Sequence, residues 1–232
     1  MTMWTSDIFA AALFQSPSWA VESFSGEQLS MAFESDFPLE PLSVLVSQRR
    51  KTLRPQETPT ALFTYVGLED IEPETGLLLH TNVVEGRKIR SASKCFSADD
   101  VLYSRLRPYL NKVFVASGAV TSGLCSNEFY VLTPNRDKVL PIYLRFLLSM
   151  PYVVAQAQRW QTGSALPRVP LESLGKVQLP IPPIDVQRQI VEQIDQYALR
   201  LQVLESGLNQ LRLQARTVIM DLIEKSRPPD PH

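Results

Sequence analysis

The strongest constraint on the fold is a regular apolar repeat near the end of the 232-residue chain. Apolar side chains recur at alternating steps of four and three residues, at Ile190, Ile194, Tyr197, Leu201, Leu204, Leu208, Leu211, Ala215, Val218 and Leu222. This spacing is typical of a helix with a coiled-coil seam. Pro182 and Pro183 precede the repeat, Pro228 follows it, and Asp185 is a candidate N-cap. The pattern predicts a helix of about 40 residues, or about 60 Å.

A helix of this length limits how the rest of the chain can cover it. A body of about 140 residues has a diameter of only about 30 to 40 Å, so it cannot bury the whole seam. We therefore expect dimerisation through a partner helix; the alternative is a helix that lies along its own domain. Further apolar side chains lie off the seam and indicate a wider contact: Val191, Val203, Leu213, Ile219 and Ile223.

Charge divides the chain into unlike segments, although the whole sequence carries a net charge of only -1. Residues 1–40 contain six acidic side chains and no Lys or Arg, and we expect a peripheral arm with short helices at 9–14 and 29–33. Residues 41–183 carry a net charge of +6 and form the predicted body. Residues 184–227 form the long helix and 228–232 a tail. The basic excess peaks within 87–115, which favours either a basic surface or solvated charges at strand edges.

The predicted body mixes strands and helices. Short apolar runs separated by turn residues predict strands at 61–68, 76–80, 100–106, 112–118 and 127–132, and another at 176–183. Pro141 and Pro151 each open a helical segment, and a short element is expected at 171–174. Because these elements do not alternate as βαβ units, we predict an α+β fold in which one mixed α/β domain precedes the long C-terminal coiled-coil helix.

The motifs of several protein classes are missing from the sequence. No apolar stretch reaches the ~20 residues of a membrane-spanning helix, and the first residues lack the basic region of a secretory signal, so a cytoplasmic location is expected. Cys95 and Cys125 have no zinc-type neighbours and are expected to be buried thiols. Phosphate-binding loops, hydrolase motifs and the Glu-x-Lys of nucleases are absent. We therefore expect no catalysis by this chain, no cofactor and no metal site.

Three segments carry a resemblance to one family. They are TYVGLEDIEPETGLL at 64–78, FSADDVLYSRLRPYLNKVFVASG at 96–118 with CSNEFYVLTP at 125–134, and GSALPRVPLESLGKVQLPIPPIDVQRQIVEQID at 163–195. In order and spacing, these strings resemble the target recognition domain and following helix of type I restriction-modification DNA specificity subunits. The third string is the most specific, because it joins a Gly-to-Arg loop, a short turn, a strand ending in Ile-Pro-Pro and Gln187 opening a long helix. The resemblance covers about residues 42–225.

The resemblance implies a non-catalytic protein that binds double-stranded DNA. Such subunits bring methyltransferase subunits, and through them restriction subunits, to a bipartite sequence. They usually contain two target recognition domains and two long helices, which pair as a spacer between the half-sites. This sequence contains one of each, so we expect a homodimer of half-subunits that resembles one full-length subunit. The alternatives are a coiled-coil adaptor that does not bind DNA and one half of a heterodimeric split subunit.

Three groups of side chains are candidate DNA contacts. The first offers cations and a ring that suit phosphates and guanine edges: Arg105, Arg107, Tyr109 and Lys112. The second is a polar loop around a glycine that allows close approach: Gln161, Thr162, Gly163, Ser164 and Arg168. The third is expected to hold phosphates without reading sequence: Arg87, Lys88, Arg90 and Lys94. As alternatives, Arg105 can pair with Asp99 or Asp100, and the loop can simply join two elements.

Overall fold

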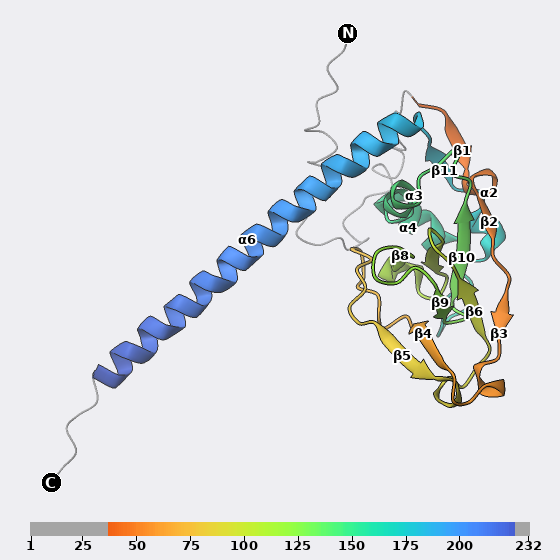
Figure 1. Ribbon diagram of the computed structural model, residues 1–232. Helices are drawn as coiled ribbons and strands as arrows, with labels where there is room; N and C mark the ends of the chain where they lie inside the picture. Colours follow the sequence, from red (N-terminus) through yellow and green to blue (C-terminus); the bar gives the residue numbers. More distant parts are fainter. Residues whose placement is uncertain (1–36, 226–232) are drawn as a thin grey trace. The chain divides into compact units, whose positions relative to one another are not determined.

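The computed structural model describes residues 37–225, apart from several side chains of the last helix. It divides into two units, a body that ends at Gln187 and the rest of the long helix from Arg188 (Figure 1). The mixture of strands and helices confirms the predicted α+β fold class. The helices predicted at 9–14 and 29–33 lie outside the described residues. None of the described helices is both long enough and apolar enough to cross a bilayer.

The body is built on three sheets (Figure 1). The smallest pairs β1 (Leu39–Pro41) with β11 (Gln178–Pro180), so strand pairing begins inside the segment that we expected to be an arm. The second is antiparallel, in the order β2 (Val46–Gln48), β10 (Phe129–Pro134), β7 (Val101–Ser104), β8 (Val113–Val115). The third has the order β3 (Thr52–Leu53), β6 (Ser93–Phe96), β9 (Gly123–Cys125), β4 (Leu62–Val66), β5 (Asn82–Glu85), with β4 and β9 parallel.

The two larger sheets share one apolar core. Its fully buried side chains come from both sheets and from the turns between them, and include Val66, Ile71, Phe96, Leu102, Phe114, Phe129 and Val131. Burial of such side chains is the main stabilising contribution to a fold of this size. Phe129 begins β10, so the residues just before it lie at the end of a strand that the core holds in place.

Short helices cover the edges of these sheets. They are α2 (Leu42–Leu45), α3 (Pro141–Leu148), α4 (Pro151–Arg159) and α5 (Leu171–Leu174), with 3-10 turns η2 (Pro55–Glu57), η3 (Gly86–Lys88) and η4 (Pro108–Leu110). Pro141 and Pro151 occupy first-turn positions, as predicted, where the missing N–H costs no hydrogen bond. In Figure 1, α3 lies beside β8. Helix α4 contacts η4, which fixes the turn that follows β7.

Most of the predicted strands are confirmed. Strands β4, β7, β8 and β11 fall within the segments where we expected strands, β10 overlaps the segment 127–132 and continues to Pro134, and α5 is the short element at 171–174. The prediction at 76–80 is wrong. This segment makes a single bridge, Ile71 to Leu78, and belongs to a tight turn in which Glu74 and Gly76 have positive φ. The turn backbone prevents continuous pairing, and Leu77 and Leu79 remain exposed.

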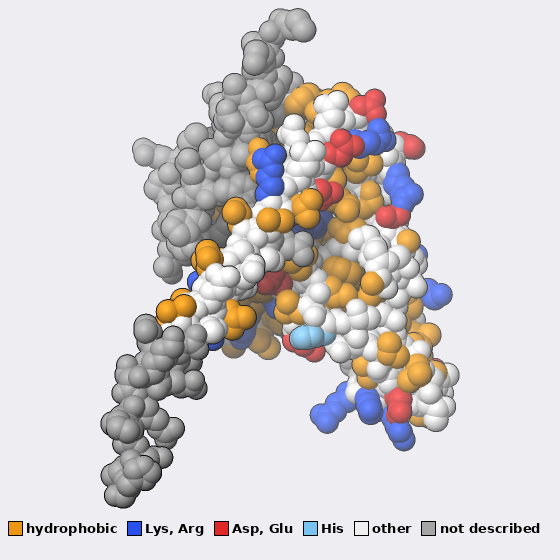
Figure 2. All heavy atoms as spheres, turned by 60° about the vertical axis from the view of Figure 1, so that its left-hand side comes forward, with side chains coloured by type: hydrophobic (Ala, Val, Ile, Leu, Met, Phe, Trp, Pro, Cys, Tyr) orange, Lys and Arg blue, Asp and Glu red, His pale blue; other side chains and the backbone are white. Residues whose placement is uncertain are grey.

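The long helix α6 runs from Ile184 to Lys225, as its apolar repeat predicts. It starts directly after Pro183, whose carbonyl accepts hydrogen bonds from the backbone of Val186 and Gln187. The N-cap prediction for Asp185 is therefore wrong, because Asp185 lies inside the first turn, where the helix dipole favours a carboxylate. Seam side chains later in the helix are exposed in the chain, Leu204 by 68% and Leu211 by 63%, whereas Ile190, Ile194 and Tyr197 are partly buried. Figure 2 shows hydrophobic side chains at the surface along the described part of this helix.

Candidate nucleic-acid interface

Two segments that are far apart in the sequence meet at the end of β7. The backbone N–H of Arg107 donates to Pro167 at 2.8 Å, and the N–H of Val169 donates to Arg105 at 3.0 Å. Thr162 and Arg168 exchange two backbone hydrogen bonds of 2.8 and 2.9 Å, which closes the loop between them. Residues 105–109 of the first group and 162–168 of the second, which sequence analysis treated separately, therefore form one surface.

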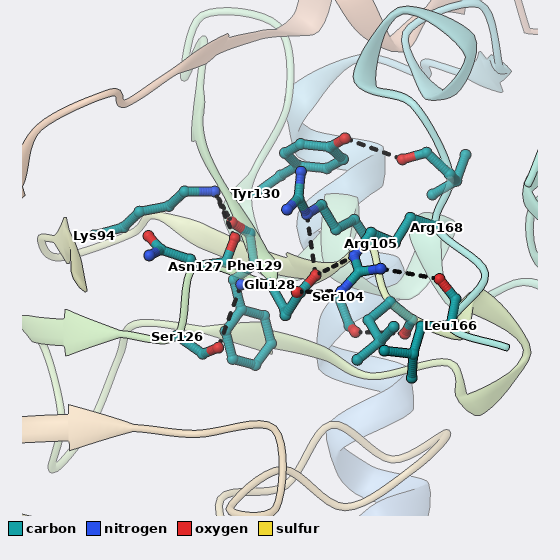
Figure 3. Close-up of polar contacts among 12 residues, drawn as sticks. Lys94, Ser104, Arg105, Ser126, Asn127, Glu128, Phe129, Tyr130, Leu166 and Arg168 are labelled. Atoms are coloured by element: carbon teal, nitrogen blue, oxygen red, sulfur yellow. Dashed lines mark hydrogen bonds and ion pairs between the residues drawn. The ribbon is translucent and has the colours of Figure 1, made fainter. Parts of the chain in front are cut away.

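The carboxylate of Glu128 joins these segments through their arginines (Figure 3). Arg168 donates from Nε to Oε2 at 2.9 Å and from Nη2 to Oε1 at 2.7 Å. Arg105 donates from Nε to Oε2 at 3.1 Å. The hydrogen bonds from Arg168 are the main cause that lowers the pKa of Glu128 below its usual value, against the opposing effect of partial burial, and the charge of Arg105 adds to it. Glu128 is therefore ionised near neutral pH, and the three residues form an ionic triad.

Lys94 and Tyr130 lie next to this triad (Figure 3). The ammonium of Lys94 donates to the carbonyls of Asn127 at 2.9 Å and Phe129 at 2.5 Å, the two neighbours of Glu128. Burial, and then the nearby charge of Arg105, lowers the pKa of Lys94. Lys94 and Arg105 lie over the Tyr130 ring at 5.5 and 5.9 Å from its centroid, and the Tyr130 hydroxyl donates to Val169 at 3.0 Å. Lys94 thus has a structural role in the body.

Arg107 and Tyr109 project from the same surface without such ties. Both are exposed, Tyr109 by 43%, and the structure gives the Arg107 side chain no hydrogen bond or ion pair within the described residues. Arg107 has φ of 47°, in the left-handed region that a non-glycine residue seldom occupies. The hydrogen bond from its N–H to Pro167 and the η4 turn that follows hold this conformation. Unpaired side chains on a fixed backbone are suited to contact another molecule.

The rest of the loop is polar and mostly exposed. Thr162, Gly163 and Ser164 are exposed, and Gly163 has φ of 92°, a conformation that favours glycine. Gln161 ends the turn after α4, where its backbone N–H donates to Gln158 at 3.2 Å. Its side-chain oxygen is buried and has no hydrogen-bond partner among the described residues. Thr162 and Ser164 therefore offer their polar side chains at the surface, whereas Gln161 faces inward.

Lys112 and three residues of the third group, Arg87, Lys88 and Arg90, lie in other parts of the body. The ammonium of Lys112 donates to the backbone carbonyl of Leu68 at 2.7 Å, which joins β8 to the turn after β4. Arg87 pairs with Glu85 on the edge strand β5, and Lys88 and Arg90 are exposed nearby in the sequence. Of the three groups, the structure thus connects Arg105, Arg107, Arg168 and Lys94 in one network and ties Lys112 elsewhere.

The carboxylates proposed as alternative partners of Arg105 pair elsewhere. Asp100 is fully buried and accepts from Arg49 Nε at 2.6 Å and from Thr133 at 2.6 Å, and Asp99 pairs with Arg136. The partner of Arg105 is Glu128, which sequence analysis missed because an acid before a strand gives no local signal of a partner 23 residues away. Within residues 37–225, no side chains form a cluster with the donors that a metal ion requires.

Comparison with known proteins defines the class of protein to which this fold and surface belong. A family model described as the type I restriction modification DNA specificity domain matches residues 71–212, more than half of the chain. The chain belongs to this family. The specificity subunit of the type I restriction enzyme EcoDI from Escherichia coli is 25% identical over 157 residues, 67% of this chain and 34% of that protein. The HindI specificity subunit from Haemophilus influenzae is 27% identical over 105 residues, 44% of this chain and 22% of that protein.

Solved structures share the fold. The HsdS subunit from Thermoanaerobacter tengcongensis superposes with a TM-score of 0.65 at 21% identity, covering 84% of this chain and 51% of that one. A chain from a study of complex assembly and conformational transition of a type I R-M system gives a TM-score of 0.69 at 20% identity, covering 85% and 53%. The chain therefore spans about half the length of these structures and about a third of its relative from E. coli.

Proposed function

We propose that this chain is a sequence-specific DNA-binding subunit of a type I restriction-modification complex and is not itself catalytic. The observation that carries this proposal is the joined surface of residues 105–109 and 162–168, where Arg107 and Tyr109 are exposed. Guanidinium groups bind phosphates and guanine edges with two parallel hydrogen bonds, and exposed rings stack on bases. Family membership supports the same role. In this proposal residues 41–183 form the recognition domain.

The helix 184–227 is the proposed dimerisation element. Its seam side chains Leu204, Leu208 and Leu211 are 68%, 49% and 63% exposed in the single chain, and a heptad seam is self-complementary. Pairing with the helix of a second copy buries this seam along its length. An antiparallel homodimer then carries two identical recognition domains at the ends of a rod of about 60 Å.

The rod relates helix length to the DNA site. A length of about 60 Å is slightly less than two turns of B-DNA at ~34 Å per turn, so two domains can reach grooves on one face and read an interrupted palindrome. Methyltransferase subunits, which recruit restriction subunits, are the proposed protein partners. Their proposed docking surface is the apolar surplus outside the seam, where Val203 and Leu213 are each 65% exposed.

The central experiment uses the full chain with its methyltransferase subunit and a pool of random-sequence duplexes. We expect enrichment of one interrupted palindrome, and a molar mass of twice 26.2 kDa for the chain alone by light scattering at micromolar concentration. Insertion of one heptad in α6 is expected to lengthen the preferred spacer by about 3 base pairs, because seven residues add about 10 Å.

Other outcomes identify the competing functions. Failure to enrich any sequence, with or without the methyltransferase, contradicts DNA recognition and leaves a coiled-coil adaptor. A monomeric chain that enriches two unlike half-sites after co-purification with another half-subunit identifies a heterodimeric specificity subunit. An unchanged spacer after the heptad insertion contradicts the rod geometry alone.

A further inference from the structure

The arginines of the candidate surface differ in how many of their donors are already used. Arg168 uses its guanidinium donors within the chain. Nε and Nη2 donate to Glu128, and Nη1 donates to the Leu166 carbonyl at 3.0 Å. Arg105 donates to the same carboxylate. Arg107, in contrast, has no such partner within residues 37–225. Three arginines on one surface therefore differ in how many donors remain for another molecule.

Glu128 is held in place by its backbone as well as its carboxylate. Its carbonyl accepts a hydrogen bond from the backbone N–H of Arg105 at 2.9 Å. The Lys94 ammonium donates to the carbonyls of the residues on either side, Asn127 and Phe129. Only 22% of its side chain is exposed. A carboxylate fixed in this way holds the two guanidinium groups in a defined position and orientation. A freely moving, solvent-exposed carboxylate would not do so.

The triad acts on the loop that it borders. Arg168 closes the loop by its backbone exchange with Thr162 and by its Nη1 contact to Leu166. The pairing of Arg107 with Pro167 and of Val169 with Arg105 then attaches the closed loop to the end of β7. The Glu128 carboxylate accepts hydrogen bonds from both Arg168 and Arg105. These side-chain contacts add to the backbone hydrogen bonds that join the loop to the end of β7.

We propose that Glu128, Arg105 and Arg168 are positioning residues, and that Arg107, Tyr109 and Ser164 determine DNA sequence specificity on the surface that they fix; this inference rests on the DNA-binding function proposed above. A phosphate that took the Nε and Nη2 donors of Arg168, or the Nε donor of Arg105, would have to displace Glu128 and would leave two anions close together. That exchange is unfavourable, because Glu128 would lose its pairing with the guanidinium group and its carboxylate would then repel the bound phosphate. Arg107, Tyr109 and Ser164 can contact DNA without breaking an ion pair within the chain.

The test compares charge-neutral and charge-preserving changes in the full chain. The probes are the duplex that the wild-type chain enriches from a random-sequence pool and a scrambled duplex of the same composition. Glu128→Gln removes the anion with little change of shape, and Arg168→Lys keeps the charge but loses the fork. Glu172→Gln is the matched control, because Glu172 forms an exposed pair with Lys176 on α5 and its neighbouring turn.

We expect Glu128→Gln and Arg168→Lys each to weaken binding of the enriched duplex about tenfold, the size of one lost base contact, with affinity for the scrambled duplex and the salt slope unchanged. The double variant is expected to lose little more than either single variant, because the residues act as one unit. Glu172→Gln is expected to match the wild type. Stronger binding of both duplexes by Glu128→Gln, with a steeper salt slope, overturns the inference and makes the arginines direct phosphate contacts restrained by Glu128.

Hydrogen exchange separates this inference from the proposed function. In the absence of DNA, Glu128→Gln is expected to speed exchange at the amides of Thr162, Arg107 and Arg168, because their hydrogen bonds close the loop. Unchanged exchange at these amides contradicts the positioning role even where DNA binding is lost. If the wild-type chain binds no DNA but Glu128→Gln still speeds exchange, the proposed function fails while the triad keeps its role as a loop clamp.

Discussion

The side chain of Gln187 is bonded to the backbone of Leu140, 47 residues earlier. Its Oε1 accepts the Leu140 N–H at 2.9 Å, and its Nε2 donates to the carbonyls of Lys138 at 2.8 Å and Pro182 at 2.9 Å. The Gln187 side chain is completely buried; its hydrogen bond to Pro182 is buried and those to Lys138 and Leu140 are partly buried. The first turn of α6 is therefore anchored to the segment that leads into α3.

Gln187→Ala is expected to destabilise the body by about 3 kcal/mol, because it removes three hydrogen bonds to backbone groups that are buried or partly buried. Urea unfolding followed by tryptophan fluorescence measures this change. Gln189→Ala, two residues along the same helix and exposed, is the control and should change stability by less than about 0.5 kcal/mol. Equal effects of the two substitutions would contradict the anchoring role of Gln187.

Arg107→Ala is expected to weaken DNA binding without changing thermal stability, because the side chain is exposed and unpaired within the described chain. A contact to a phosphate predicts a salt slope lower by about 1, and a contact to a guanine predicts a loss of about 1 to 3 kcal/mol confined to the enriched sequence. Fluorescence anisotropy at several salt concentrations distinguishes them. Arg54→Ala, a change of an exposed arginine near Glu57, is the control. Unchanged affinity and slope would remove Arg107 from the interface.

Acidic substitutions in the seam should prevent dimerisation. Leu204→Glu with Leu211→Glu places charges on the surface that two helices would share, and we expect the mass in light scattering to fall from twice 26.2 kDa to the monomer value. Val203→Glu with Leu213→Glu is the matched control, since these side chains are equally exposed but lie off the seam. A dimer that survives the seam variant, or dissociates equally in both, argues against the seam as the interface.

The stabilising effect of Glu128 should depend on pH in the acid range. Its folded pKa is lowered, first by the Arg168 hydrogen bonds, so the carboxylate contributes stability that is fully present above the unfolded pKa of ~4.3. This contribution is lost as the pH falls through the lowered folded value. The difference in unfolding free energy between wild type and Glu128→Gln is therefore expected to be constant from pH 5 to 7. It should shrink below about pH 4. A difference that persists at low pH would assign the effect to packing.

Thiol reactivity should separate the two cysteines. Cys125 is fully buried, and burial raises the pKa of its thiol to about 12, whereas Cys95 is partly exposed. Because the thiolate is the reactive form, Cys95→Ser is expected to leave the folded chain unreactive toward Ellman's reagent near neutral pH. Cys125→Ser should retain one reactive thiol, and both variants should react once unfolded in urea. Rapid reaction of folded Cys95→Ser would show that the core around Cys125 opens.

Local patterns predicted the elements whose signal lies within one segment. The heptad repeat predicted α6, and the positions of Pro141 and Pro151 predicted the starts of α3 and α4. Strands β1, β2, β3, β5, β6 and β9 were missed, because runs of two to four residues carry no detectable alternation. The leucines at 77–79 suggested a strand, but the positive φ of Glu74 and Gly76 shows that turn geometry prevailed over side-chain preference.

Partners were harder to predict than elements. The sequence marked Arg105 and Arg168 as cations near a loop, but whether a cation is free or paired depends on distances between residues 23 and 40 positions apart. Only folding brings Glu128 between them. The third group was described by charge alone, and the structure gives Lys94 a structural role that its type does not reveal.

The class of fold, the long helix with its apolar seam and the family could be read from the sequence alone, because periodicity and ordered motifs are properties of the linear chain. The tertiary structure decided which arginines are occupied and which are available. It did so because ion pairing and burial depend on through-space contacts made by residues that the chain keeps far apart. Arg105 and Arg107 differ by two positions in the sequence, and only the position of Glu128 in space separates their roles.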